Sequence, residues 1–336
     1  MLEPITMTDP TERYVLLERA DGLFVASDGA RPPSQMSDAG LWRSSGDSWV
    51  NAADDSLLNP SEDLHRVPGP DRLLSTLAAE FSTQGWICLP GILDKKVVDE
   101  LRLVAGDQVG VKQGGLTERA AVAQAVAEPV SLWLCQQYLG STAIKIAHPP
   151  SIAVVGQDDG QRDVQGWHSD YPYLWGITDA VPQIPSELIL GVQRNVCITD
   201  FSRDNGATMF VLGSHKKNSG PPQDWGLQRH YGRSGFRLES GLPYQGEGDE
   251  AVQVIEAPAG SILLYDARTW HRQGIGCVPD LRAAMLQAMV PAYVAPFYDT
   301  AEEYEALCQA AFYLDLTRRE KEVLSQLLVH ARPTGS

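Results

Sequence analysis

The chain has 336 residues, 43% of them hydrophobic and 21% charged, which is typical of a globular protein with a substantial buried core. Its formal net charge of -16 argues against a nucleic-acid or anionic-membrane surface, because both attract basic patches. Five scattered cysteines without a Cys-x-x-Cys pair argue against a thiolate zinc site. Neither a signal peptide nor an apolar stretch of about 20 residues is evident, so we expect a soluble cytoplasmic protein.

Residues 1–70 are predicted to form an N-terminal extension, a candidate lid or homodimer arm. Two strand-like runs flank Asp21-Gly22, a turn sequence that predicts a hairpin. The following Ser-, Asp- and Pro-rich stretch contains Trp42 and Trp49, which indicates that it packs against another surface. The alternative is that residues 1–70 form an ordered segment that packs around the rest of the protein and has no catalytic role.

Helical spacing dominates from residue 71 to residue 139. An apolar stripe from Leu73 to Phe81 predicts a helix, which Gln84-Gly85 ends before a strand at 86–89. Asp94 is expected to cap a second helix, and a third helical region at 117–139 is interrupted at Pro129.

Short strands alternate with turn signals from about residue 144 to residue 295. This pattern favours an all-β core with flanking helices, as in a double-stranded β-helix (jelly roll, cupin-like) sandwich spanning 71–298. Asp204-Asn205-Gly206 predicts a hairpin turn between two of the strands. Residues 299–336 are predicted to be helical again. The predicted strands are 144–146, 152–155, 188–198, 208–212, 252–255, 261–265 and 283–290.

His168 and Asp170 are two residues apart in a predicted extended segment, so their side chains point to the same side. One imidazole and one carboxylate make up two thirds of a 2-His-1-carboxylate face for Fe(II). His271 follows a predicted strand and opens a glycine-bearing loop, which makes it a candidate second histidine.

Arg282 begins a strand eleven residues after His271 and leads an otherwise apolar face. Burying an arginine there is costly without an anionic partner. Its guanidinium could bind a carboxylate of a small molecule, to which its paired donors are matched, or form an ion pair with a nearby Asp or Glu.

Five motifs in order resemble the phytanoyl-CoA dioxygenase family of Fe(II)/2-oxoglutarate oxygenases over about 71–292, and the segment 85–93 is similar to that family's opening. The motifs are His168-Ser169-Asp170, Asp204-Asn205-Gly206-Ala207-Thr208, Leu212-Gly213-Ser214-His215-Lys216, His271 and Arg282.

The resemblance implies that His168, Asp170 and His271 bind Fe(II), and that Arg282 holds the distal carboxylate of 2-oxoglutarate. O2 would be the third reactant, and His215 is interpreted as structural. Further cosubstrate contacts are expected from Lys145, Gln193 and Asn195. Aromatic residues crowd the first motif and are candidates for a substrate pocket: Trp167, Tyr171, Tyr173 and Trp175.

The implied reaction converts 2-oxoglutarate to succinate and CO2 while a C–H bond of a small metabolite or natural-product intermediate is hydroxylated. Desaturation, epoxidation or ring formation on the same core are alternatives, and the carboxylate of Asp170 argues against halogenation. Two other classes stay open: a zinc-dependent cupin-like hydrolase or isomerase, and a non-catalytic metal-binding protein.

Overall fold

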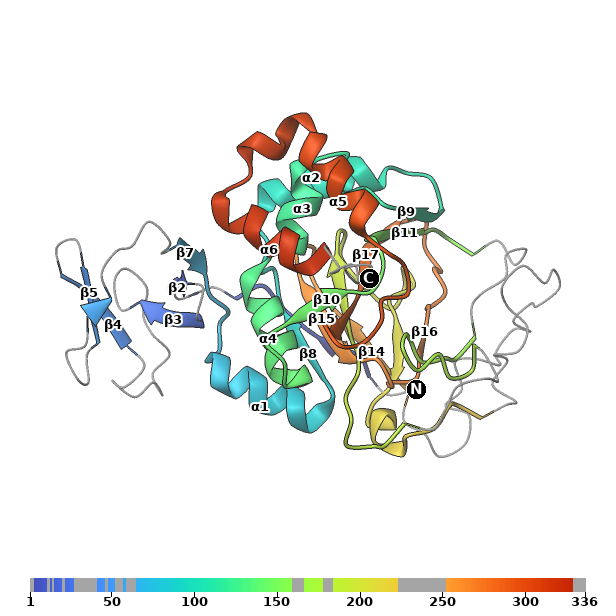
Figure 1. The fold of residues 1–336 in the computed structure, drawn as a ribbon. Coiled ribbons are helices and arrows are strands. Elements are labelled where there is room, and N and C mark those ends of the chain that lie inside the picture. The colour runs from blue at the N-terminus through green and yellow to red at the C-terminus, as the bar shows by residue number, and fades with distance from the viewer. Residues whose placement is uncertain are drawn as a thin grey trace, which may run out of the picture.

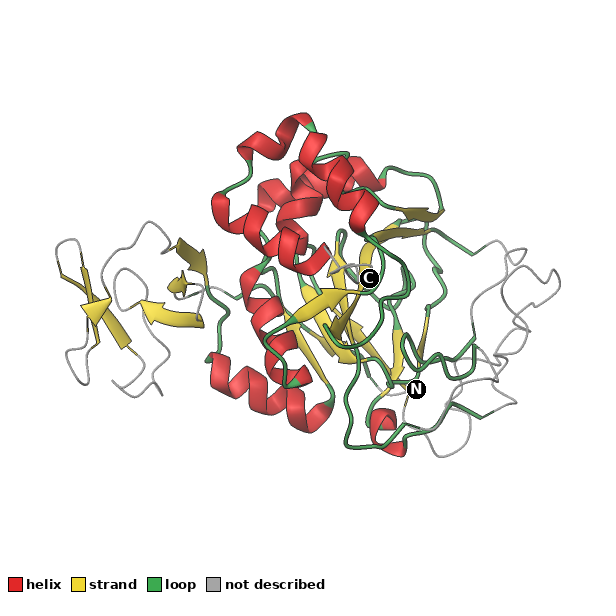
Figure 2. Ribbon diagram, in the orientation of Figure 1, coloured by secondary structure: helices red, strands yellow, loops and turns green. Residues whose placement is uncertain are grey.

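The computed structural model describes residues 3–10, 13, 15–19, 22–26, 41–45, 48–51, 57–58, 65–158, 166–177, 184–222 and 252–328. Its centre is a β-sandwich covered by helices on one side (Figures 1 and 2). No helix in these ranges is long and apolar enough to cross a membrane.

The larger sheet of the sandwich is antiparallel and has the order β8-β15-β12-β17-β11-β9, with β10 also paired to β17. The smaller sheet has the order β1-β14-β13-β16. In chain order the strands are β1 (Ile5–Thr6), β8 (Trp86–Leu89), β9 (Gly110–Gln113), β10 (Ile144–Ile146), β11 (Ser151–Val155), β12 (Val192–Cys197), β13 (Met209–Val211), β14 (Val252–Glu256), β15 (Ile262–Asp266), β16 (His271–Arg272) and β17 (Arg282–Pro291).

Alternation along the central strands separates two apolar cores. In β17, Met285 and Met289 pack with the helices, whereas Ala284 packs between the sheets. In β12, Val196 likewise faces the helices and Cys197 the sandwich interior. Because side chains alternate along a strand, Arg282 lies on the interior face of β17 with Ala284.

The helices cover the larger sheet (Figure 1). They are α1 (Leu74–Gln84), α2 (Lys95–Ala105), α3 (Ala120–Val126), α4 (Pro129–Leu139), α5 (Ala301–Gln309) and α6 (Arg318–Leu328). Two sequence predictions are confirmed here: Asp94 caps α2 by accepting a 2.7 Å hydrogen bond from Lys96 N, and Pro129 occupies the first turn of α4. Proline is tolerated there because that turn needs no amide donor.

The hairpin predicted at Asp204-Asn205-Gly206 is wrong. β12 and β13 belong to different sheets, so this turn carries the chain from the larger sheet to the smaller one. Asn205 stabilises it by accepting from Ser202 N (2.9 Å) and donating to Asp200 O (2.8 Å). Turn chemistry alone does not say whether the flanking strands pair. The strand predicted at 188–198 is also shorter, since β12 begins at Val192.

The N-terminal region forms a separate six-stranded sheet with the order β6-β5-β4-β3-β2-β7. The predicted hairpin at Asp21-Gly22 is confirmed, because β2 and β3 pair antiparallel across it. Side chains of Trp42 and Trp49 lie outside the described residues. The strands are β2 (Val15–Arg19), β3 (Gly22–Ala26), β4 (Leu41–Ser45), β5 (Ser48–Asn51), β6 (Leu57–Leu58) and β7 (His65–Pro68).

Removing the cap of α2 tests the link between sequence and fold. We expect Asp94→Ala to lower the free energy of unfolding by about 1 kcal/mol, because the amide of Lys96 loses its acceptor. Urea unfolding followed by circular dichroism measures this. Asp94→Ser keeps an acceptor and should stay near wild type; equal unfolding midpoints for Asp94→Ala and wild type would contradict the assignment.

Candidate metal centre

His168, Asp170 and His271 converge at one point of the sandwich, with one potential ligand atom of each lying within 4.8 Å of the others. Nε2 of His271 lies 3.0 Å from Oδ2 of Asp170, and Nε2 of His168 lies 3.7 Å from Oδ1. The side chain of Asp170 is 25% exposed, against 4% for His168 and 7% for His271. Asp170 is therefore the most exposed of the three candidate ligand side chains.

Backbone pairing sets the two histidines side by side. His168 N donates to His271 O (3.1 Å), and His271 N donates back to His168 O (3.0 Å). Each Nδ1 also meets a carbonyl two residues upstream, Gly166 O at 2.8 Å and Thr269 O at 2.9 Å. A carbonyl accepts only, so Nδ1 carries the proton and Nε2 presents its lone pair to a metal.

The charges of the cluster favour a cation. Burial raises the pKa of Asp170, but the neighbouring His271 and His168 outweigh it and hold this pKa at about 2. Burial conversely lowers the pKa of His271, and Asp170 more than compensates, so the net shift is upward. Asp170 is therefore ionised at neutral pH and supplies the negative ligand that a divalent metal needs.

A buried ion pair holds the loop that carries His271. Arg268 donates to Asp266 through Nε (2.9 Å) and Nη2 (2.7 Å), and Tyr138 of α4 donates to the same carboxylate (2.7 Å). Two backbone carbonyls of this loop accept hydrogen bonds from the segment that carries the other ligands. Ser169 Oγ donates to Arg268 O (3.0 Å), and Asp170 N donates to Ala267 O (2.9 Å). The two ligand-bearing segments are thereby joined at several points.

Arg282 is a buried cation that pairs with no carboxylate of the described residues. Its side chain stacks at 4.8 Å on the ring of Phe201, its Nε has no hydrogen-bond partner, and within the described ranges no carboxylate forms an ion pair with it. Burial lowers its pKa to about 10, which still leaves the guanidinium charged at neutral pH. Such a group fits an anionic ligand, and the ion-pair alternative finds no partner there.

Two of the other predicted cosubstrate residues also lie in the interior. Asn195 Nδ2 donates to the hydroxyl of Tyr265 (3.3 Å), and Gln193 Nε2 approaches Tyr171 O at 3.5 Å. Lys145 does not join them, because its ammonium donates to Gln326 O in α6. The structure thus gives no support to a cosubstrate contact by Lys145.

The four predicted substrate-pocket aromatics divide into two pairs. Trp167 is 1% exposed and lies within the interior core. Tyr173 is fully buried, and its hydroxyl donates to Leu188 O (3.0 Å) and accepts from Leu190 N (2.9 Å). Tyr171 and Trp175 are partly exposed. Aromatic side chains near a motif serve equally well as core, which is why sequence could not separate these pairs.

Sequence analysis missed two aromatic residues beside the ligands. The hydroxyl of Tyr265 lies 3.3 Å from Asp170 Oδ2, and its ring lies 5.1 Å from that of His271. Phe210 packs edge-on against Tyr265 at 5.1 Å. Alternation along 262–266 puts Tyr265 on one face with Leu263, but only the packed sheets show that this face is the interior.

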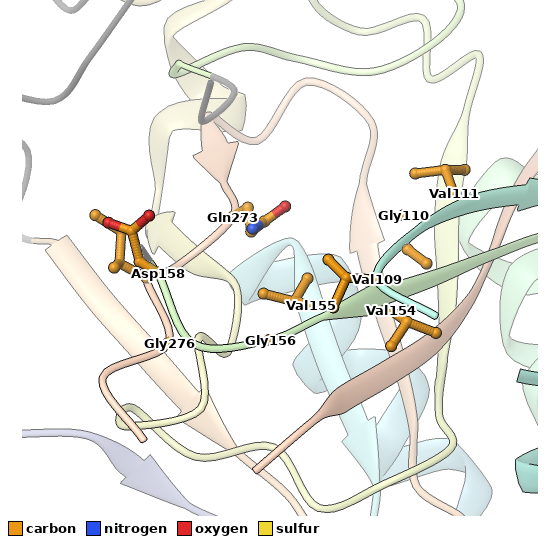
Figure 3. A pocket seen from close by; sticks show the side chains of 11 residues that line it. Val109, Gly110, Val111, Val154, Val155, Gly156, Asp158, Gln273 and Gly276 are labelled. Atoms are coloured by element: carbon orange, nitrogen blue, oxygen red, sulfur yellow. The ribbon is translucent and has the colours of Figure 1, made fainter. Parts of the chain in front are cut away.

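A surface groove lies at the β9–β11 end of the sandwich, next to the segment that leaves β16 (Figure 3). None of the three candidate ligands lines it. Its lining residues are Val109, Gly110, Val111, Ala153, Val154, Val155, Gly156, Asp158, Gln273, Ile275 and Gly276.

Residues 99–274, just over half of the chain, match the family model of phytanoyl-CoA dioxygenase (PhyH). The chain belongs to this family, which confirms the resemblance found in the sequence. Among curated relatives, the ectoine dioxygenase of Stutzerimonas stutzeri is 28% identical over 126 residues, covering 35% of this chain and 38% of the relative. Dioxygenase hkm4 of Aspergillus hancockii is 27% identical over 146 residues, covering 43% and 39%. The chain thus spans little more than a third of these relatives.

Solved structures agree with the predicted jelly-roll fold. HygX from Streptomyces hygroscopicus with iron bound has a TM-score of 0.52 at 17% identity, covering 68% of this chain and 93% of HygX. HygX with nickel and 2-oxoglutarate bound has a TM-score of 0.50 at 16% identity, with the same coverage.

His215 has a structural environment, as its motif suggested. It is 4% exposed and its ring lies against Gly85, where a side-chain Cβ would come within 2.4 Å of the imidazole. Burial lowers the pKa of His215, although Asp266 opposes this shift. At a pH between the lower folded-state pKa and the unfolded pKa, His215 is therefore neutral in the folded protein and protonated in the unfolded chain.

This pKa shift predicts a pH dependence of stability. The contribution of His215 is fully present above its unfolded pKa of about 6.5 and is lost as pH falls through the lower folded-state pKa. The free energy of unfolding should consequently fall more steeply on acidification for wild type than for His215→Gln, which cannot titrate. Denaturant unfolding at several pH values measures both curves, and parallel curves would show that His215 is not held neutral.

Proposed function

We propose that this protein is an Fe(II)- and 2-oxoglutarate-dependent oxygenase acting on a small molecule. The observation that carries this proposal is the charged and buried Arg282, which has no anionic partner among the described residues. It lies on the interior face of the sandwich that also contains the His168, Asp170 and His271 cluster. A metal face and a separate anion receptor are the two parts needed to hold a cosubstrate that chelates iron and carries a distal carboxylate.

The residues fit the metal on donor chemistry. Two imidazole nitrogens and one ionised carboxylate oxygen form the 2-His-1-carboxylate set typical of non-haem Fe(II), with positions left for other ligands. When bound, iron supplies the oxidative chemistry that couples decarboxylation of 2-oxoglutarate to oxidation of a C–H bond.

The protein's own residues orient the reactants and exclude water. Arg282 would bind the distal carboxylate, its desolvated guanidinium forming stronger hydrogen bonds there than in water. The interior beside it is apolar, with Ala284, Phe210 and Cys197 among its buried residues, which keeps bulk water from the site. The partly exposed Asp170 marks the side from which a substrate would reach the metal.

Relatives favour a small metabolite or natural-product intermediate as the prime substrate. The matched curated proteins include an ectoine dioxygenase and dioxygenase hkm4 of Aspergillus hancockii. Hydroxylation is the reaction we propose, with desaturation, epoxidation or ring formation as outcomes that the same core supports. A zinc hydrolase is disfavoured, since it has no need of a buried anion receptor such as Arg282.

Anaerobic spectroscopy tests the proposal. We expect Fe(II) and 2-oxoglutarate added together to give the weak visible charge-transfer band of the chelate. Asp170→Ala combined with His271→Ala should abolish it, because two of three ligands are gone. His148→Ala removes a partly buried histidine outside the cluster and should retain the band. No band with wild type, or an undiminished band in the double variant, would refute the oxygenase assignment.

Arg282 can be tested by titrating 2-oxoglutarate into the Fe(II) protein. Removing a charged hydrogen-bond donor costs about 1.5–3 kcal/mol, so Arg282→Ala should raise the 2-oxoglutarate Kd about 10- to 100-fold. Metal affinity should hardly change. Arg282→Lys keeps the charge but loses the paired donors, so its 2-oxoglutarate Kd should lie between those of wild type and Arg282→Ala. If Arg282→Ala requires no more 2-oxoglutarate than wild type, Arg282 does not bind the cosubstrate.

A further inference from the structure

Asp170 reaches the metal cluster from an irregular segment, not from a regular strand. Its backbone makes three hydrogen bonds, from Asp170 N to Ala267 O (2.9 Å) and to Asp170 O from Tyr173 N (2.9 Å) and Leu174 N (3.0 Å). Its carboxylate receives a side-chain contact from the sheet, because the hydroxyl of Tyr265 lies 3.3 Å from Oδ2. Both histidines, by contrast, have their imidazoles fixed by local carbonyls. Among the described residues outside the ligand set, Tyr265 is the hydrogen-bond donor that contacts the Asp170 carboxylate.

The hydrogen bonds around Tyr265 have a defined direction. Asn195 Nδ2 lies 3.3 Å from the Tyr265 hydroxyl oxygen and can only donate to it. An ionised carboxylate can only accept, so the hydroxyl proton points to Asp170 Oδ2. The Tyr265 hydroxyl thus accepts a hydrogen bond from Asn195 and donates one to the carboxylate of Asp170.

The sheet makes this arrangement rigid. Tyr265 of β15 is paired with Gln193 of β12, and Asn195 lies two residues further along β12, so Asn195 and Tyr265 are diagonal neighbours on the interior face. Tyr265 is 2% exposed and its ring is held edge-on by both Phe210 and His271. A side chain packed from several directions can fix a flexible neighbour at little further entropic cost.

We propose that Tyr265, oriented by Asn195, is a positioning residue that holds the Asp170 carboxylate ready to bind the metal. This inference rests on the proposed metal site and extends it to two residues of the larger sheet. It also gives Asn195 a role through Tyr265 in place of the direct cosubstrate contact expected from sequence.

Metal affinity without cosubstrate is the direct test. Metal-free protein is titrated anaerobically with Fe(II) against a chromophoric chelator, and the Kd is compared for wild type, Tyr265→Phe, Asn195→Ala and the double variant. Loss of a group that orients a ligand typically costs 10- to 100-fold in metal affinity, so we expect at least about a tenfold weaker Kd for Tyr265→Phe. Asn195→Ala should weaken binding in the same direction. The double variant should bind no more weakly than Tyr265→Phe, because the two residues act through one hydroxyl.

Thr300→Val is the matched control. It also removes a buried hydroxyl, which donates to Leu328 O (2.6 Å) between the C-terminal helices, and Thr300 is not in the ligand cluster. Both variants should lose thermal stability, but only Tyr265→Phe should lose metal affinity. Equal Fe(II) affinity in Tyr265→Phe and wild type would overturn the positioning role, and a raised 2-oxoglutarate Kd alone would make Tyr265 a cosubstrate contact. Failure of wild type itself to bind Fe(II) would instead refute the proposed function.

Discussion

The reciprocal backbone hydrogen bonds between His168 and His271 are the constraint on which the site depends. They join two segments about a hundred residues apart and set the imidazoles 4.3 Å apart, centroid to centroid. Because upstream carbonyls occupy both Nδ1 atoms, both Nε2 atoms are left for a common metal. Asp170 then joins them because it lies two residues beyond His168 on the same side of the chain.

Two buried arginines on adjacent strands lie on opposite faces of the larger sheet and differ in their partners. Arg194 of β12 faces the helices, where Ser131 Oγ (2.8 Å) and Ala125 O (2.6 Å) accept from it. Arg282 of β17 faces the interior and is left without a protein anion among the described residues. The first guanidinium is satisfied by the fold. The second has an unmet electrostatic requirement, which a carboxylate ligand would meet.

Local patterns predicted local structure well. The helix cap at Asp94, the proline at the start of α4 and the N-terminal hairpin all follow from interactions within a few residues, and all are confirmed. The turn at Asp204-Asn205-Gly206 was predicted as a turn but assigned the wrong partners. Which strands pair across a turn depends on where distant strands bury their apolar faces, and a short motif holds no information about this.

The sequence by itself determined the family and the candidate ligand set, since the spacing of His168 and Asp170 and the order of the later motifs are properties of the chain. Only the tertiary structure decided which residues share the interior. It placed Tyr265 against Asp170, turned Lys145 to the carbonyl of Gln326 and buried Trp167 as core. The physical reason is that alternation along a strand defines two faces but does not label them. Packing of one sheet against the other makes one of those faces the site.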